Sequence, residues 1–159
     1  MRERLHNLFL LCKLLPMLMA SAAQRQLLAE MMRFLRELPA IMKRPLPDAM
    51  RMVAALPVPV RLPEKRLREL ADLAAALERR SVPGICLKRS LIRYRYLSAI
   101  DVPLEVVFGV RFKDVKQAQR QIAGHAWLEQ DGVVYFESAE NTTPFKPIFR
   151  WPITKAVGS

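Results

Sequence analysis

A cysteine and a histidine are the two side chains of this sequence that could together act as nucleophile and base. Cys86 follows the turn-forming residues 81–84 and begins a segment with helical spacing, so its thiol is expected in the first turn of a helix. Backbone N–H groups and the helix dipole stabilise a thiolate there, and Lys88 and Arg89 add positive charge. The same N–H groups could hold a developing oxyanion. Cys86 is therefore a candidate nucleophile, although buried, unreactive cysteines are also common.

His125 is the candidate base, and the turn of its hairpin decides which side chain faces it. Asp131-Gly132 between two alternating segments is a strong hairpin signal. A two-residue turn would place His125 opposite Ser138, whereas a three-residue loop that ends in a left-handed glycine places it opposite Glu137. We expect the three-residue loop, because the Glu137 carboxylate could then fix the imidazole tautomer and stabilise imidazolium. The alternative is a half-buried strand histidine bonded to a backbone carbonyl.

The other carboxylates near this hairpin are poorer partners for the imidazole. Asp131 lies in the turn, and Glu140 lies beyond the end of the predicted strand. Glu129 shares the face of His125 but lies four residues along the same strand, about 13 Å away. Strand geometry therefore favours Glu137 as the orienting acid.

Residue types are unevenly spread, and the two halves of the chain favour different secondary structure. The first half contains all eight methionines and no glycine before Gly84, which is typical of helices. The second half contains all five glycines and ten of the twelve aromatic residues, which is typical of strands and turns. We therefore predict an α+β protein. We place a helical N-terminal region over residues 1–60, packed on a second domain over residues 61–159.

The spacing of apolar residues, together with proline and glycine, divides the chain into expected elements. Pro39 is expected to end the first of four predicted helices, which cover residues 22–38, 47–56, 65–80 and 85–94. Gly109 is expected to mark a bulge or a close approach in the first of three predicted strands, which cover residues 104–112, 124–129 and 133–137. The polar residues 113–122 are expected to form a loop or a helical excursion beside the sheet.

Composition argues against several classes of protein. Two cysteines and two histidines do not suit a disulfide scaffold or a structural zinc site, so we expect reduced thiols in the cytoplasm and no cofactor. The first residues imitate a secretory signal, but Lys13 and Pro16 interrupt the apolar stretch, which is too short to span a bilayer. A buried amphipathic helix is the expected structure there. The net charge of +11 favours anionic partners.

Four short motifs in a fixed order resemble those of a known enzyme family. They are Cys86-Leu87-Lys88-Arg89-Ser90, Gly109-Val110, His125-Ala126-Trp127-Leu128-Glu129 and Asp131-Gly132. The set resembles the transglutaminase-like cysteine peptidases of lasso-peptide biosynthesis, in the stand-alone form whose leader-recognition domain is a separate protein. In that family the motifs run C-L-x-R-S, G-V, H-A-W-V-E and D-G.

The resemblance implies a papain/transglutaminase-like fold, with a catalytic helix and an antiparallel sheet. It also implies that the enzyme removes the leader from a ribosomally made precursor peptide. Cys86 matches the family's nucleophile, His125 its base, and Glu137 the position twelve residues later that is usually Asp. We place Leu87, Arg89 and Trp127 in the substrate and oxyanion region. The implied partners are the precursor leader, the leader-recognition protein and an ATP-dependent lasso cyclase.

Two other functions fit some of the same residues. An acyl or amide transferase would use the same triad up to the acyl-enzyme and would differ only in the acceptor. A basic interaction module with an unreactive thiol would use the positive charge to contact nucleic acid. We expect no nucleic-acid partner, because the sequence shows no helix-turn-helix, zinc finger or aromatic RNA-reading motif.

Overall fold

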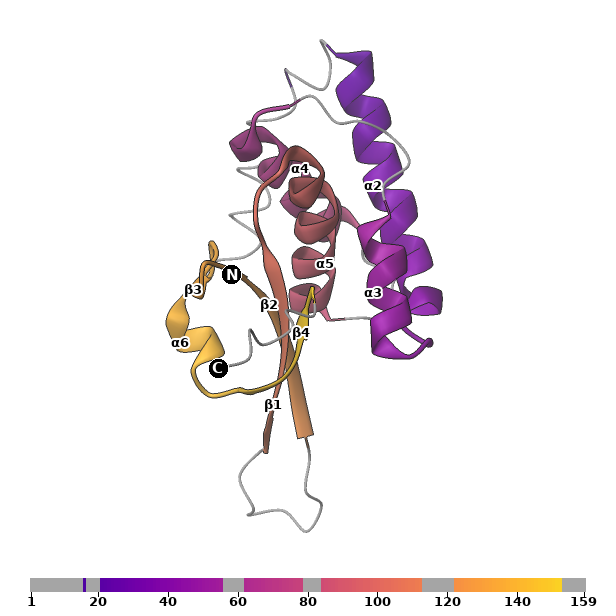
Figure 1. The fold of residues 1–159 in the computed structure, drawn as a ribbon. Coiled ribbons are helices and arrows are strands. Elements are labelled where there is room, and N and C mark those ends of the chain that lie inside the picture. Colours follow the sequence, from indigo (N-terminus) through magenta and orange to yellow (C-terminus); the bar gives the residue numbers. More distant parts are fainter. Residues whose placement is uncertain (1–15, 17–20, 56–61, 79–83, 113–121, 153–159) are drawn as a thin grey trace. The chain divides into compact units, whose positions relative to one another are not determined.

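The chain divides into a helical unit and a sheet-containing unit. The computed structural model describes residue 16 and residues 21–55, 62–78, 84–112 and 122–152. The two compact units are Met1–Val102 and Pro103–Ser159, and they confirm the predicted α+β class with a helical first half (Figure 1). The units divide after Val102, whereas the domain boundary that we placed near residue 60 stays a prediction.

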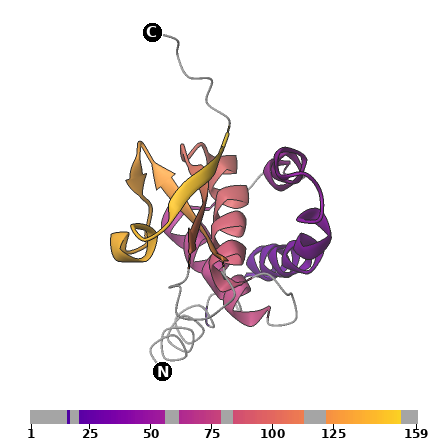
Figure 2. The same cartoon turned by 90° about the horizontal axis from the view of Figure 1, so that it is seen from below.

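The described part of the first unit is built from helices around one apolar core. Its elements are α2 (Ala22–Ile41), α3 (Leu46–Ala54), α4 (Glu64–Leu77), α5 (Ile85–Leu97) and the short 3₁₀-helix η1 (Ser98–Ile100). α2 packs against both α4 and α5, and α3 packs against α2 and α5 (Figure 2). Fully buried side chains from all four α-helices meet in the core: Met31, Leu35, Leu38, Met50, Leu67, Leu70, Leu91 and Ile92. None of the helices in the described ranges is long and apolar enough to cross a membrane.

α4 and α5 form an antiparallel pair that sets where α5 begins. Arg93 on α5 donates two hydrogen bonds of 2.7 Å to the Asp72 carboxylate on α4. At the end of α4, the buried ammonium of Lys88 donates to the backbone carbonyl of Glu78 at 2.8 Å. The start of α5 therefore lies beside the end of α4.

Pro39 does not end α2, contrary to our prediction. The helix continues to Ile41, and the N–H of Met42 still donates to the carbonyl of Leu38 at 2.9 Å. A proline this close to the C-terminus removes only one backbone hydrogen bond of the last turn. Burial of the Ile41 side chain favours the extra turn.

The other helices largely follow the sequence-based expectation. α3 begins and ends close to the predicted range, and α5 extends beyond Tyr94 to Leu97. α4 ends at Leu77, three residues short of the predicted end, and residues 79–80 lie outside the described residues. Residues 1–15, where we expected an amphipathic helix, and most of the predicted loop 113–122 also lie outside them.

The described part of the second unit is a four-stranded antiparallel sheet. Its elements are β1 (Glu105–Phe112), β2 (Ile122–Gln130), β3 (Val133–Val134), the short helix α6 (Ala139–Thr142) and β4 (Lys146–Trp151). The strand order is β3-β2-β1-β4, so β4 is an edge strand. We did not predict β4, which contains Pro147. A proline is tolerated on an edge strand, where a missing N–H need not break the sheet ladder.

The β2–β3 hairpin has a two-residue turn, so the three-residue loop that we predicted is wrong. Gln130 pairs with Val133 across the turn. Asp131 and Gly132 both have positive φ angles, 51° and 77°. Two successive left-handed residues are the mark of a type I′ turn, whose twist matches that of the flanking strands. The intrinsic preference of Asp-Gly for this turn set the register.

Gly109 confirms both expectations for its position, a bulge and a close approach. The pairing of β1 with β4 shifts register between Phe108 and Gly109. On the other side Gly109 pairs with His125. A Cβ atom at Gly109 would lie 2.7 and 2.8 Å from two ring carbons of Trp127 and 3.0 Å from the Cβ of Phe145. The absence of a side chain is therefore what allows the indole to lie on this strand.

Replacing Gly109 by alanine should destabilise the protein, because the new methyl group overlaps the Trp127 ring. We expect a loss of about 1–3 kcal/mol in the free energy of unfolding, measured by urea denaturation. Gly124→Ala is the matched control on β2, since a Cβ there meets no atom within 4 Å. The control should stay within about 0.5 kcal/mol of wild type. Equal losses for the two variants would contradict the close approach.

Candidate functional site

Cys86 lies in the first turn of α5, as the sequence predicts. Gly84 is the N-cap residue and provides no side-chain hydrogen bond, so the first N–H groups of the helix have no acceptor within it. Cys86 is a free, half-buried thiol. A Cβ atom built on Gly84 would lie 3.7 Å from its Sγ atom, so the sulfur lies over the N-cap residue. This is the end of the helix whose dipole stabilises a thiolate or an oxyanion.

The two cations that follow Cys86 have partners on α4 or at its end. Lys88 is buried and bonds the Glu78 carbonyl, and a residue two positions along a helix does not share the face of Cys86. The Nε atom of Arg89 lies 3.9 Å from the Asp72 carboxylate. Lys88 therefore ties α5 to α4, which differs from the supporting role beside the thiol that we expected. Leu87 and Arg89 are partly exposed, and their assignment to a substrate region stays a prediction.

Glu137 contacts His125, as predicted, although by a different route along the chain. The Nε2 atom of His125 lies 2.8 Å from the Oε1 atom of Glu137. Continuation of the two-residue register would have turned Glu137 to the other face. β3 instead ends at Val134, the N–H of Tyr135 still bonds the Leu128 carbonyl at 2.8 Å, and Phe136 then adopts a left-handed φ of 48°.

The left-handed conformation of Phe136 therefore brings Glu137 to His125, which we had expected a three-residue loop to do. An Nε2–H donating to the Glu137 carboxylate leaves the lone pair on Nδ1, which is the nitrogen that could accept a proton. The His125 side chain is only 12% exposed, so its contact with the carboxylate is partly shielded from water. This half of the site can orient a base and stabilise its protonated form.

Two aromatic rings contact the imidazole. The ring of Trp127 stacks on His125 with centroids 5.8 Å apart and planes inclined by 21°. The ring of Phe145 lies 5.0 Å from the imidazole, and the guanidinium of Arg111 lies 4.9 Å above that ring. We did not predict Phe145, which joins α6 to the unpredicted strand β4. Its position beside His125 is fixed by the fold of the second unit alone.

Trp127 is not available as an oxyanion donor. The residue is 3% exposed, and the N–H group of its indole donates to the Oε1 atom of Glu129 at 2.8 Å. Indole has no other donor, so Trp127 can contribute only an apolar ring surface. We had placed Trp127 in the substrate and oxyanion region with the family resemblance, and the motif alone does not reveal how the indole N–H is used.

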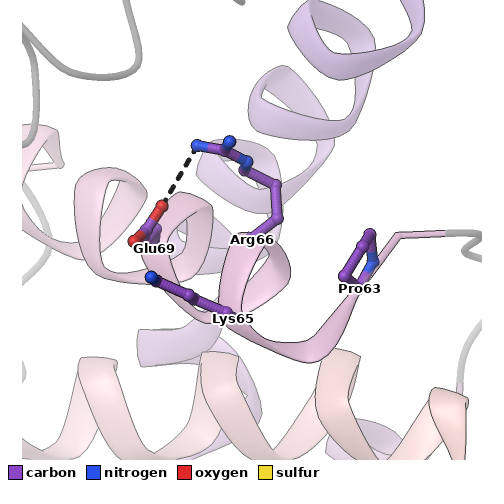
Figure 3. Close-up of a pocket in the computed structure, with 4 residues that line it drawn as sticks. All are labelled: Pro63, Lys65, Arg66 and Glu69. Carbon is purple, nitrogen blue, oxygen red and sulfur yellow. Dashed lines mark hydrogen bonds and ion pairs between the residues drawn. The ribbon is translucent and has the colours of Figure 1, made fainter.

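A hollow of about 200 Å³ lies at the start of α4 (Figure 3). It is lined by Pro63, Lys65, Arg66 and Glu69, and Arg66 forms an ion pair of 3.2 Å with Glu69. Because α4 and α5 are antiparallel, this end of α4 lies at the opposite end of the helix pair from Cys86. The hollow therefore does not belong to the predicted site. Within the described ranges, no group of three or more His, Cys, Asp or Glu side chains could hold a metal ion.

Residues 20–150 match the family model of the transglutaminase-like superfamily. The match spans most of the chain, so the chain belongs to this superfamily, in which cysteine protease and transferase activities are common. It includes much of the region 1–60 that we had separated from the catalytic domain. No curated protein and no solved structure matches the chain significantly.

Iodoacetamide at neutral pH should alkylate Cys86 before Cys12. Cys86 lies half-buried in the first turn of α5, whereas Cys12 has leucine on both sides in the sequence. Mass spectrometry of tryptic peptides would follow the two sites, with Cys86→Ala and Cys12→Ala as reciprocal controls. Faster labelling of Cys12 would contradict the choice of nucleophile.

Proposed function

We propose that this member of the transglutaminase-like superfamily is a cysteine peptidase that removes the leader from a ribosomally made lasso precursor peptide. The observation that carries the proposal is the 2.8 Å contact between His125 and Glu137, which prepares an imidazole to act as a base. Cys86 at the start of α5 supplies the matching nucleophile. The three residues have the chemical types of a nucleophile, a base and an orienting acid.

The proposed reaction begins with transfer of the Cys86 thiol proton to Nδ1 of His125. The thiolate then attacks the carbonyl carbon of the scissile amide, and the N–H groups at the start of α5 hold the oxyanion. Collapse of this intermediate breaks the C–N bond, and His125 returns its proton to the departing amine. Water, deprotonated by His125, then hydrolyses the thioester and releases the leader as a free acid. Glu137 holds the imidazole in one tautomer throughout.

The lasso-leader substrate is supported by the order of the motifs from Cys86 to Gly132, which resembles that of lasso leader peptidases. The net charge of +11 would favour an acidic leader or acidic partner proteins. We propose a separate leader-recognition protein and an ATP-dependent lasso cyclase as partners, in the cytoplasm. No phosphate-binding glycine loop is present in the sequence, so ATP would bind the cyclase.

An acyl or amide transferase is the second candidate, because transferases are common in the same superfamily. The two activities share the thioester and differ in whether water or an amine resolves it. Mass spectrometry of the leader product separates them, since hydrolysis gives a free carboxylic acid and transfer gives a new amide.

Cys86→Ala should abolish cleavage of the precursor, because no other group would form the thioester. The assay combines the full chain with the precursor peptide and the leader-recognition protein, and mass spectrometry detects the leader. Cys12→Ala is the control and should retain wild-type cleavage. Cleavage by the Cys86→Ala protein would refute the proposed nucleophile.

Glu137→Gln should keep the fold but slow single-turnover cleavage by about 10- to 100-fold, because an amide cannot stabilise imidazolium as a carboxylate does. Glu140→Gln, at an exposed residue of α6, is the matched control and should leave the rate unchanged. Glu137→Asp restores the residue expected from the family resemblance and should retain activity if the shorter side chain reaches the ring. An unchanged rate for Glu137→Gln would exclude the proposed role.

A further inference from the structure

We propose that Glu129 is a positioning residue that fixes the indole of Trp127, which in turn holds His125 against Glu137. The inference rests on the proposed function, in which His125 is the base. Glu129 touches neither His125 nor Glu137 in the described contacts. Any effect of Glu129 on His125 would pass through the indole ring of Trp127.

Both oxygens of the Glu129 carboxylate have a donor. Oε1 accepts from the Trp127 indole at 2.8 Å, and Oε2 accepts from the Arg150 guanidinium at 2.6 Å. The side chain of Glu129 is 10% exposed, whereas that of Arg150 is 44% exposed. The hydrogen bond with Glu129 is the main cause that raises the pKa of Arg150 above its usual value. Arg150 also donates to Glu105 at 3.2 Å.

A buried carboxylate is not needed to fill space, because apolar residues of similar volume often stabilise a protein as well or better. The Glu129 carboxylate instead favours one orientation of the indole. An indole can rotate by half a turn about its bond to Cβ and occupy much the same volume, but only one orientation brings its N–H to Glu129. The hydrogen bond therefore selects the orientation in which the ring edge lies over Gly109.

The orientation of Trp127 bears directly on the imidazole. His125, Trp127 and Glu129 alternate along β2 and so share one face of the sheet. The indole stacks on the imidazole, and Phe145 contacts the imidazole as well. Rotation of His125 away from Glu137 would have to displace one of these rings. A fixed indole thus restricts the imidazole to the orientation in which Nε2 meets Glu137.

The first experiment reads the tautomer of His125 and needs no substrate. The full chain carries His6→Gln, so that His125 is the only imidazole, and ¹⁵N NMR distinguishes the Nε2–H form from the Nδ1–H form. We expect a single Nε2–H tautomer in this background and a mixture in Glu129→Met, which is similar in length but accepts no strong hydrogen bond. Glu129→Gln retains an acceptor for the indole and should restore most of the single tautomer.

Glu105→Gln is the matched control. Arg150 donates to Glu105, whereas the indole N–H of Trp127 donates to Glu129, so replacing Glu105 perturbs the same guanidinium without removing the acceptor of the indole. It should leave the tautomer and the cleavage rate unchanged. Equal effects of Glu105→Gln and Glu129→Met would show that the Arg150 ion pairs matter and would overturn the role of Trp127.

The second experiment measures precursor cleavage. Glu129→Met should lower kcat by about 10- to 100-fold, because small displacements of a catalytic group are costly, with KM within about twofold of wild type. In a Glu137→Gln protein the same change should have little further effect, because the contact that it protects has already been weakened. Full additivity of the two changes, or unchanged kcat and tautomer in folded Glu129→Met, would overturn the proposal.

If Glu129→Met does not fold, Trp127→Phe decides the question, since it keeps a ring but removes the N–H. Its His125 should show mixed tautomers, and a single tautomer would overturn the inference. The two readouts also separate this inference from the proposed function. If the wild-type chain cleaves no precursor but the Glu129→Met or Trp127→Phe variant shows mixed tautomers, the positioning role stands and the proposed substrate is wrong. If the wild-type chain cleaves the precursor but the variants keep a single tautomer, the proposed substrate stands and the positioning role is wrong.

Discussion

The indole of Trp127 lies directly on the backbone of Gly109, and the sheet face around His125 depends on that contact. A Cβ at Gly109 would come within 2.7 Å of the ring, so any larger residue would move it. From this ring the face extends in two directions, to the stacked imidazole of His125 and to the Glu129 carboxylate that accepts the indole N–H. Arg150 then compensates the buried charge of Glu129.

The antiparallel pairing of α4 and α5 is the corresponding constraint in the first unit. The Arg93–Asp72 hydrogen bonds and the buried Lys88 ammonium align the two helices. α5 begins at Ile85, and its N-cap residue Gly84 provides no side-chain hydrogen bond. Cys86 lies in the first turn of α5. The first unit thus carries a thiol in the first turn of a helix, and the second carries an imidazole that contacts a carboxylate. The lasso-leader proposal assigns both groups to one reaction.

The sequence by itself was enough to find the features that depend on local forces. Apolar spacing and turn residues placed the helices and the first two strands, because amphipathic periodicity and backbone preferences act over a few residues. The position of Cys86 in the first turn of a helix followed from the turn before it. Gly109 was predicted to mark a bulge or a close approach, because a glycine within a strand often marks one of these. The contact between His125 and Glu137 was also predicted, but from the wrong turn length and strand register.

Only the tertiary structure decided how that pairing is made and what surrounds it. The Asp-Gly turn set a two-residue register, and a left-handed Phe136 then brought Glu137 back to His125. No pattern in the sequence marks a bulky aromatic residue for that conformation, which the surrounding contacts must stabilise. The ion pair of Arg150 with Glu129 and the position of Phe145 beside the imidazole likewise depend on residues that are distant in the sequence. Such contacts arise from the packing of whole elements, and local preference does not specify them.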